Sequence, residues 1–290
     1  MIHELSAQPL YIQINFWLLV GSALLVVALT LFPWFLKAAN GNMSSEPSIW
    51  KLPEVPMFRG SKFPLPADHI LMLCYVGMTV LMIAPCCFES ATATPESTEE
   101  TIDIISVWIN TIFNFAIYLP FLIRYGIITR MSFSLRFSHL GLTILALGSI
   151  YTVSAIVDIS GLAEWLMQKT GAPETQYAIR QITESAGNID TILPVIVNAV
   201  FIAPLVEELF FRGFIYNILK KHTGILTAAL VSGLFFGAVH ISLVQCIILT
   251  IFGIVQCFLY EHTRSIVYPM LLHMIFNGIA MSMLFLVSIN

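Results

Sequence analysis

The sequence alternates between long apolar segments and short polar connections. Eight of the apolar segments approach the roughly 20 residues that a helix needs to cross the hydrocarbon core of a bilayer. They cover residues 14–36, 69–88, 104–123, 137–162, 191–219, 223–241, 243–260 and 265–289. Their apolar character is continuous rather than alternating, which favours helices over the strands of a membrane barrel. The predicted fold is all-α, a polytopic transmembrane helical bundle of about eight spans that forms a single integral membrane domain.

Composition narrows the class of protein further. Of the 290 residues, 58% are apolar and 10% are charged, against about 45–50% and about 25% in soluble domains. The formal net charge of −4 offers no basic surface for nucleic acid. Five cysteines without C-x-x-C spacing are expected to pack as small apolar residues rather than form disulfides or a metal site. The composition therefore predicts membrane lipid as a partner and excludes a soluble domain, a disordered chain and a nucleic-acid-binding protein.

Lysine and arginine divide unevenly between the two sides of the predicted bundle. The side that faces the connections after spans one, three, five and seven holds eleven of the 13 basic residues, and the other side holds Lys169 and Arg180. Basic residues are enriched in cytoplasmic connections, so the eleven-residue side is expected to be cytoplasmic, with both termini outside. No basic segment precedes the first span, so a cleavable signal peptide is not expected. The predicted location is the plasma (inner) membrane.

The connection 161–190 is the longest in the second half of the chain. Leu162, Trp165 and Leu166 share one helical face, and Ile179 and Ile182 share another. Apolar faces on short segments of this kind are typical of helices that lie in the membrane interface. One or two such helices are therefore expected here.

Ionisable side chains within a membrane span are costly and indicate function. The fifth span contains Glu207, Glu208 and Arg212. Glu208 and Arg212 are four residues apart, which places them on one helical face as a structural ion pair. Glu207 points about 100° away from Glu208, so Arg212 balances its charge only indirectly. A carboxylate of this kind in an apolar surrounding readily accepts a proton, which suits a general base.

Two further spans contribute polar groups at similar depth. His240 ends the sixth span, after Phe236, and His273 and Asn277 lie on one face of the eighth. Both side chains of the eighth span need polar partners inside the protein. Gly237 and Gly278 would let neighbouring helices approach closely.

The residue types alone leave three chemistries open. A carboxylate and an imidazole can deprotonate water, and an imidazole with a carboxamide can stabilise an oxyanion, which together suit amide hydrolysis within the membrane. One glutamate and two histidines could instead bind Zn²⁺ for a metalloprotease. The same groups could serve a proton-coupled transporter, although the sequence shows no inverted repeat. A scaffold that binds a membrane partner would have no need of Glu207.

The three motifs in order resemble a known family. Glu207-Glu208-x-x-x-Arg212, Phe236-x-x-x-His240 and His273-x-x-x-Asn277 are similar to the motifs of the CAAX protease and bacteriocin-processing family. Its members are Abi-type, CAAX prenyl protease type II-like intramembrane proteases. The resemblance covers residues 191–290, a catalytic core, whereas the spans within residues 1–162 carry no motif.

The resemblance implies an intramembrane endopeptidase that hydrolyses a peptide or membrane-protein substrate without a cofactor or metal. Glu207 would activate water, which His240 would help to hold. His273 and Asn277 would stabilise the oxyanion. The supporting residues would be Glu208, Arg212 and Phe236. The substrate itself does not follow from the resemblance.

Overall fold

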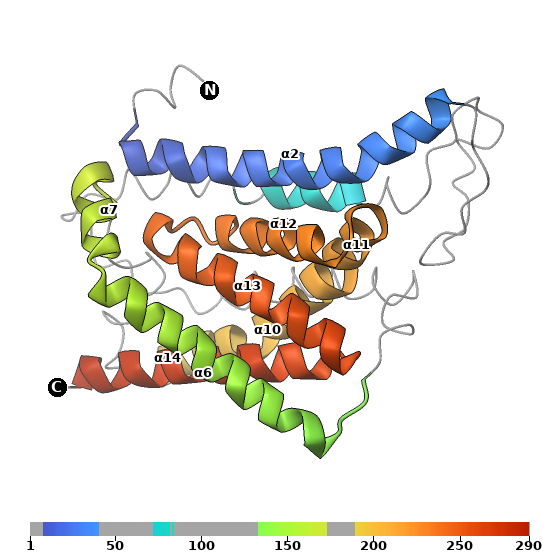
Figure 1. The fold of residues 1–290 in the computed structure, drawn as a ribbon. Helices are drawn as coiled ribbons and strands as arrows, with labels where there is room; N and C mark the ends of the chain where they lie inside the picture. The colour runs from blue at the N-terminus through green and yellow to red at the C-terminus, as the bar shows by residue number, and fades with distance from the viewer. Residues whose placement is uncertain (1–7, 41–71, 82, 84–132, 173–188, 290) are drawn as a thin grey trace.

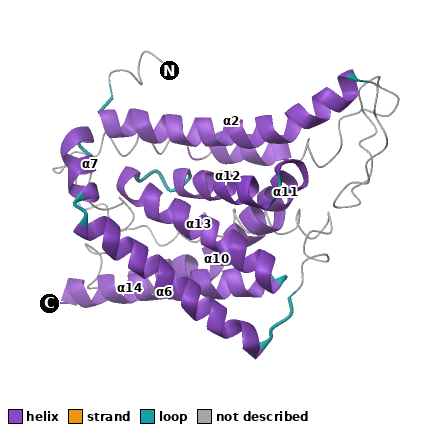
Figure 2. Cartoon of the chain, viewed as in Figure 1, coloured by secondary structure: helices purple, strands orange, loops and turns teal. Residues whose placement is uncertain are grey.

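The computed structural model describes residues 8–40, 72–81, 83, 133–172 and 189–289. Every regular element within these residues is helical, and no strand occurs among them (Figure 2). The predicted all-α class is therefore confirmed.

Five helices in the described part of the chain are long and apolar enough to cross a membrane. They are Leu10–Leu36, Phe137–Ile159, Leu193–Thr223, Leu243–Thr263 and Val267–Leu284. These helices correspond to the first, fourth, fifth, seventh and eighth predicted spans. Of the second predicted span the structure describes the helix Met72–Leu81, and the third lies outside the described residues. The sixth is shorter than expected, because α12 runs only from Ile225 to Ala238.

The long helices lie side by side in one bundle (Figure 1). The N-terminal helix α2 (Leu10–Ala39) packs along α12, and α12 packs along α13 (Leu243–Thr263). The helix α6 (Phe137–Ile159) crosses both α13 and α14 (Val267–Ile289). A helix from the motif-free part of the chain therefore covers each side of the three C-terminal helices.

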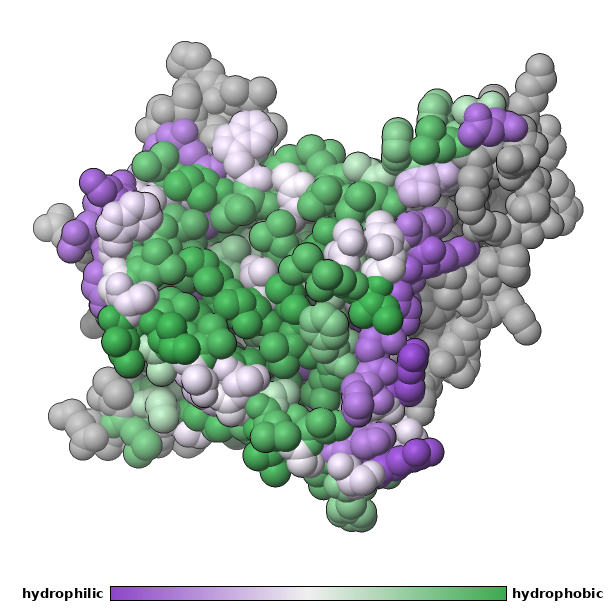
Figure 3. All heavy atoms as spheres, viewed as in Figure 1, coloured by the Kyte–Doolittle hydropathy of each residue, from purple (hydrophilic) through white to green (hydrophobic). Residues whose placement is uncertain are grey.

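The surface of the bundle matches a lipid surrounding. Figure 3 shows a broad hydrophobic face, with hydrophilic residues gathered along the edge where α11 (Asn217–Thr223) lies in Figure 1. Large apolar side chains point outward, including Leu145, Ile144 and Leu226. Water would disfavour so much exposed apolar surface, whereas acyl chains accommodate it.

The contact between α12 and α13 depends on glycine. A Cβ atom at Gly237 would lie 2.6 Å from the carbonyl oxygen of Cys246 and 3.0 Å from the backbone nitrogen of Thr250. A Cβ at Gly233 would lie 2.8 Å from the carbonyl oxygen of Thr250. The expected close approach is therefore confirmed at Gly237. At Gly278 the nearest atom, from Val200, would be at an ordinary 3.7 Å.

The connection after α6 begins with a short helix, as expected. The helix α7 runs from Leu162 to Thr170 and contains the first of the two predicted apolar faces. The second predicted face lies outside the described residues.

Candidate active site

The fifth span is a continuous but irregular helix. Two π-helical segments, η2 (Asn198–Ile202) and η3 (Leu209–Tyr216), flank α10 (Ala203–Glu208). Each π turn accommodates an extra residue and shifts the side chains that follow around the helix axis. In an ideal α-helix, nine positions amount to about 180° of net rotation, which would place Asn198 opposite Glu207. The π segments instead allow both residues to reach the same side of the span.

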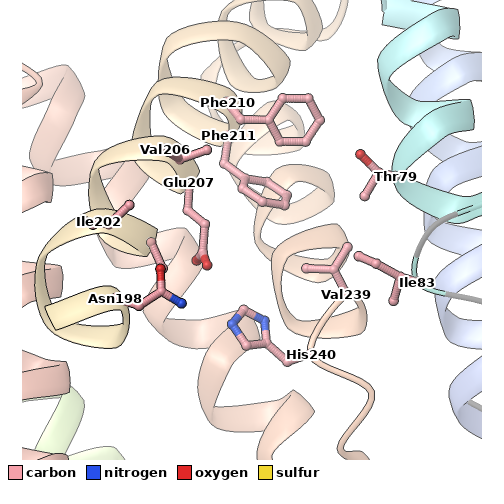
Figure 4. A pocket seen from close by; sticks show the side chains of 11 residues that line it. Thr79, Ile83, Asn198, Ile202, Val206, Glu207, Phe210, Phe211, Val239 and His240 are labelled. Atoms are coloured by element: carbon pink, nitrogen blue, oxygen red, sulfur yellow. The ribbon is translucent and has the colours of Figure 1, made fainter. Parts of the chain in front are cut away.

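A cavity of about 260 Å³ lies beside this irregular span. A water molecule occupies about 30 Å³ in the liquid, so the cavity can hold water together with part of a ligand. Figure 4 shows the carboxylate of Glu207, the amide of Asn198 and the ring of His240 pointing toward the same space. The remaining walls are mostly apolar. They are formed by Thr79, Ile83, Ile202, Ala203, Val206, Phe210, Phe211 and Val239.

Glu207 is the acidic group of this cavity. Its side chain is 29% exposed, so solvent in the cavity can reach it. The Oε2 atom is nevertheless buried and has no hydrogen-bond partner among the described residues. Nε2 of His273 lies 3.9 Å from that oxygen, which is too far for a direct hydrogen bond.

Glu208 points into the protein rather than into the cavity. Its side chain is fully buried, and Oε1 accepts a hydrogen bond from Nη1 of Arg212 at 3.0 Å. The predicted i,i+4 pair is therefore confirmed. The same oxygen accepts from Nε2 of Gln256 at 3.2 Å and lies 2.9 Å from Nδ1 of His273. One carboxylate thus joins three helices.

The contact with Glu208 sets the tautomer of His273. An ionised carboxylate can only accept a hydrogen bond, so the Nδ1 atom of His273 must carry the hydrogen. In the neutral ring Nε2 is then an acceptor, and it faces Glu207. The two adjacent glutamates therefore face different ring nitrogens of His273: Glu208 contacts Nδ1, and Glu207 lies nearer Nε2.

His240 is oriented by the end of its own helix. Nδ1 lies 2.8 Å from the carbonyl oxygen of Phe236, which can only accept, so Nε2 of the neutral ring is free to accept. The Phe236 ring contacts His240 at a centroid distance of 4.8 Å and His273 at 5.7 Å. The guanidinium carbon of Arg212 lies 4.5 Å from the centre of that ring. Phe236 therefore packs between the cation and both imidazoles.

Asn277 bonds to the backbone of the fifth span. Its Nδ2 donates to the carbonyl oxygen of Ala199 at 2.8 Å. In the π turn the amide of Ala203 bonds to Asn198, and the next amide position belongs to Pro204, which has no N–H. The side chain of Asn277 thus satisfies a carbonyl that the irregular helix leaves without a backbone donor.

The structure brings Glu207, Glu208, Arg212, Phe236 and His273 into one connected group, with His240 across the same cavity as Glu207. Asn277 reaches the edge of this group through the backbone of the fifth span and does not line the cavity. Their catalytic roles stay predictions.

Sequence reasoning missed Asn198 and Gln256. Both are polar side chains in apolar spans, and this feature alone could have indicated them as candidate site residues. Regular helical periodicity, however, places Asn198 on the face of the fifth span opposite Glu207. Gln256 belongs to none of the three sequence motifs.

The arrangement of the described side chains can be compared with the zinc site that the residue types left open. No group of three or more His, Cys, Asp and Glu side chains within the described residues is arranged to hold a metal ion. His273 also has one ring nitrogen engaged with Glu208.

Comparison with known proteins agrees with the motifs. Residues 189–279 match the family model "Type II CAAX prenyl endopeptidase Rce1-like". The chain is 29% identical over 132 residues to the "Putative membrane peptidase YdiL" of Bacillus subtilis (strain 168). That alignment covers 43% of this chain and 54% of the relative, so the chain spans about half the length of the curated relative it matches. No solved structure matches. The family resemblance predicted from the sequence is confirmed over the matched residues.

Proposed function

We propose that this chain, whose C-terminal third matches the Rce1-like family, is an intramembrane endopeptidase with Glu207 as general base. The observation that carries the proposal is the difference between the contacts of the two glutamates. The carboxylate of Glu208 contacts Arg212, Gln256 and His273. Glu207 instead has a buried oxygen with no hydrogen-bond partner among the described residues, beside the cavity that it shares with His240. A carboxylate oxygen that accepts no hydrogen bond from the described residues, in a mostly apolar cavity, is suited to accept a proton.

The reaction is a direct attack by water. Glu207 takes a proton from a water molecule that the Nε2 atom of His240 helps to hold. The water oxygen bonds to the scissile carbonyl carbon, and the carbonyl oxygen gains the negative charge. Collapse of this intermediate breaks the C–N bond, and Glu207 returns its proton to the leaving nitrogen. Atoms and charge balance without a cofactor.

The oxyanion needs hydrogen-bond donors at the same depth. His273 can donate from Nε2 when the ring is an imidazolium, whose charge Glu208 balances at 2.9 Å. Asn277 has a second N–H besides the one that bonds to Ala199. Asn198 lines the cavity directly. We propose oxyanion stabilisation by His273 and Asn277, which do not themselves line the cavity, together with Asn198, which does.

The substrate class follows from the surroundings of the site. The cavity walls are mostly apolar, and one face of the bundle is broadly hydrophobic (Figure 3). These surroundings favour a peptide that is itself held in the membrane. A prenylated carboxy-terminal peptide is the first candidate, because the matched family model carries this specificity in its name. The reaction needs no metal, and the cell compartment we propose is the plasma (inner) membrane.

Purified protein in lipid vesicles tests the proposal with two fluorogenic peptides. One ends in a farnesylated Cys-aliphatic-aliphatic-X sequence, and the other has the same sequence without the lipid. Mass spectrometry identifies the products, and a Glu207→Gln variant, which keeps size and polarity, is the matched control.

We expect the wild-type protein to cleave the farnesylated peptide and the variant to leave it intact. Cleavage of both peptides would retain the endopeptidase and remove the prenyl specificity. Failure to cleave either peptide, or equal cleavage by wild type and variant, would contradict the proposed function.

A further inference from the structure

The N-terminal helix α2 carries a buried polar side chain that bonds outside its own helix. Asn15 is 4% exposed, although it lies in an apolar span. Its Nδ2 donates to the carbonyl oxygen of Ile241 at 3.1 Å. The two bonded residues are 226 positions apart in the chain.

The acceptor residue has an unfavourable backbone conformation. Ile241 has φ of +51°, in the left-handed region that β-branched residues rarely adopt. A helix that ends this way normally uses glycine at the position. Such a residue persists only where its surroundings hold it. Here the side chain of Ile241 packs against Ile12 and Phe16 of α2, and its carbonyl is held by Asn15.

Ile241 directly follows His240, the imidazole of the cavity. The amides of these two residues bond to the carbonyl oxygens of Gly237 and Ala238 at 3.3 Å. This short turn ends α12 and directs the His240 ring toward the space in front of Glu207 (Figure 4). A change in the backbone at Ile241 would therefore rotate or displace His240.

We infer that Asn15 is a positioning residue for His240. By bonding to Ile241 it holds the strained turn, and the turn holds the imidazole over the cavity. The inference rests on the proposed function for the role of His240. It also gives the first predicted span, which carries no family motif, a part in assembling the site.

The alternative is that Asn15 only stabilises the contact between helices. The same helix offers matched controls, because Ser22 and Thr30 are also buried polar residues. Their hydroxyls bond to the carbonyl oxygens of Leu19 and Val26 within α2 itself. Ser22→Ala and Thr30→Val thus remove a buried polar group from α2 without touching the turn.

Hydrogen exchange tests the contact without needing a substrate. Asn15→Leu keeps approximate volume and removes the donor. We expect amide exchange at residues 239–242 to rise at least tenfold in Asn15→Leu, with no change there in Thr30→Val or Ser22→Ala. Should Asn15→Leu fail to fold, Asn15→Ser, which is too short to reach Ile241, replaces it. Unchanged exchange in the turn would overturn the inference.

Turnover of the farnesylated peptide tests the positioning. We expect kcat to fall at least tenfold in Asn15→Leu, with KM within twofold and both controls near wild type. In an Ile241→Gly background, where glycine adopts the turn unaided, the same substitution should cost less than threefold. Unchanged kcat, or the same loss in both backgrounds, would overturn the positioning role.

His240→Ala is run in parallel to separate the two proposals. If this variant retains wild-type turnover, the proposed function of His240 is wrong, whatever Asn15 does. If the wild type cleaves no probe, the proposed function fails, and the exchange measurement alone decides whether Asn15 holds the turn.

Discussion

Removing one partner of the buried Glu208–Arg212 pair should destabilise the protein more than removing both. In Glu208→Gln the guanidinium of Arg212 remains fully buried without its counter-charge at 3.0 Å. Breaking a buried pair in this way costs about 3–5 kcal/mol. At about 2–4 °C per kcal/mol, the melting temperature should fall by about 6–20 °C.

The double variant Glu208→Gln/Arg212→Met leaves no uncompensated charge. Replacement of a buried pair by neutral residues of similar volume is often close to neutral. Arg212 also bonds to the carbonyl oxygen of Gly253 at 3.2 Å, so a residual loss of about 0.5–1.5 kcal/mol is expected for that hydrogen bond. The double variant should therefore melt above either single variant.

The assay pairs thermal unfolding in detergent with turnover per folded molecule. In Glu208→Gln the amide oxygen can still accept the Nδ1 hydrogen of His273. Glu208→Gln also removes the negative charge that would balance a His273 imidazolium, so turnover per folded molecule should fall, but by less than the about 10²–10⁴-fold contribution of a general base. A strong loss of turnover with an unchanged melting temperature would show that the roles of the two glutamates are exchanged.

Three further predictions address packing, metal and topology. Gly237→Ala should destabilise by about 1–3 kcal/mol, because its Cβ would meet backbone atoms of α13. Gly148→Ala, whose Cβ would meet no atom of the described residues within 4 Å, should leave the melting temperature near that of the wild type. Cleavage should survive prolonged treatment with a strong chelator, and stoichiometric zinc whose removal abolishes cleavage would favour the metalloprotease. Single cysteines in the 38–67 connection should label from the cytoplasm, and those in 161–190 from outside; cytoplasmic labelling of 161–190 would reverse the predicted orientation.

The sequence predicted the parts of the site that obey regular helical spacing. Glu208 and Arg212 pair as the i,i+4 rule requires, and Gly237 marks the close helix contact. The ion pair depends on two residues one helical turn apart, and the close contact depends on the small size of one residue. Hydropathy likewise located the long helices, since length and apolar character alone define a span.

Features that depend on irregular backbone or on distant helices were beyond the sequence. Asn198 faces the cavity because π turns shift the helical period, and no local pattern reports them. Gln256 and Asn15 form their bonds with residues of other helices, so only the packed bundle reveals them. The end of α12 at Ala238 was also missed, because the apolar run continues through the turn at Ile241.

The comparison of Glu207→Gln with Glu208→Gln tests the central claim most directly. Both variants replace a carboxylate by an amide of the same size, one beside the cavity and one in the buried network. Cleavage of the farnesylated peptide per folded molecule, measured with the melting temperature of each, should fall by at least about 10²-fold in Glu207→Gln while that variant melts near wild type. Near-normal turnover in Glu207→Gln would contradict the assignment of this glutamate as the base.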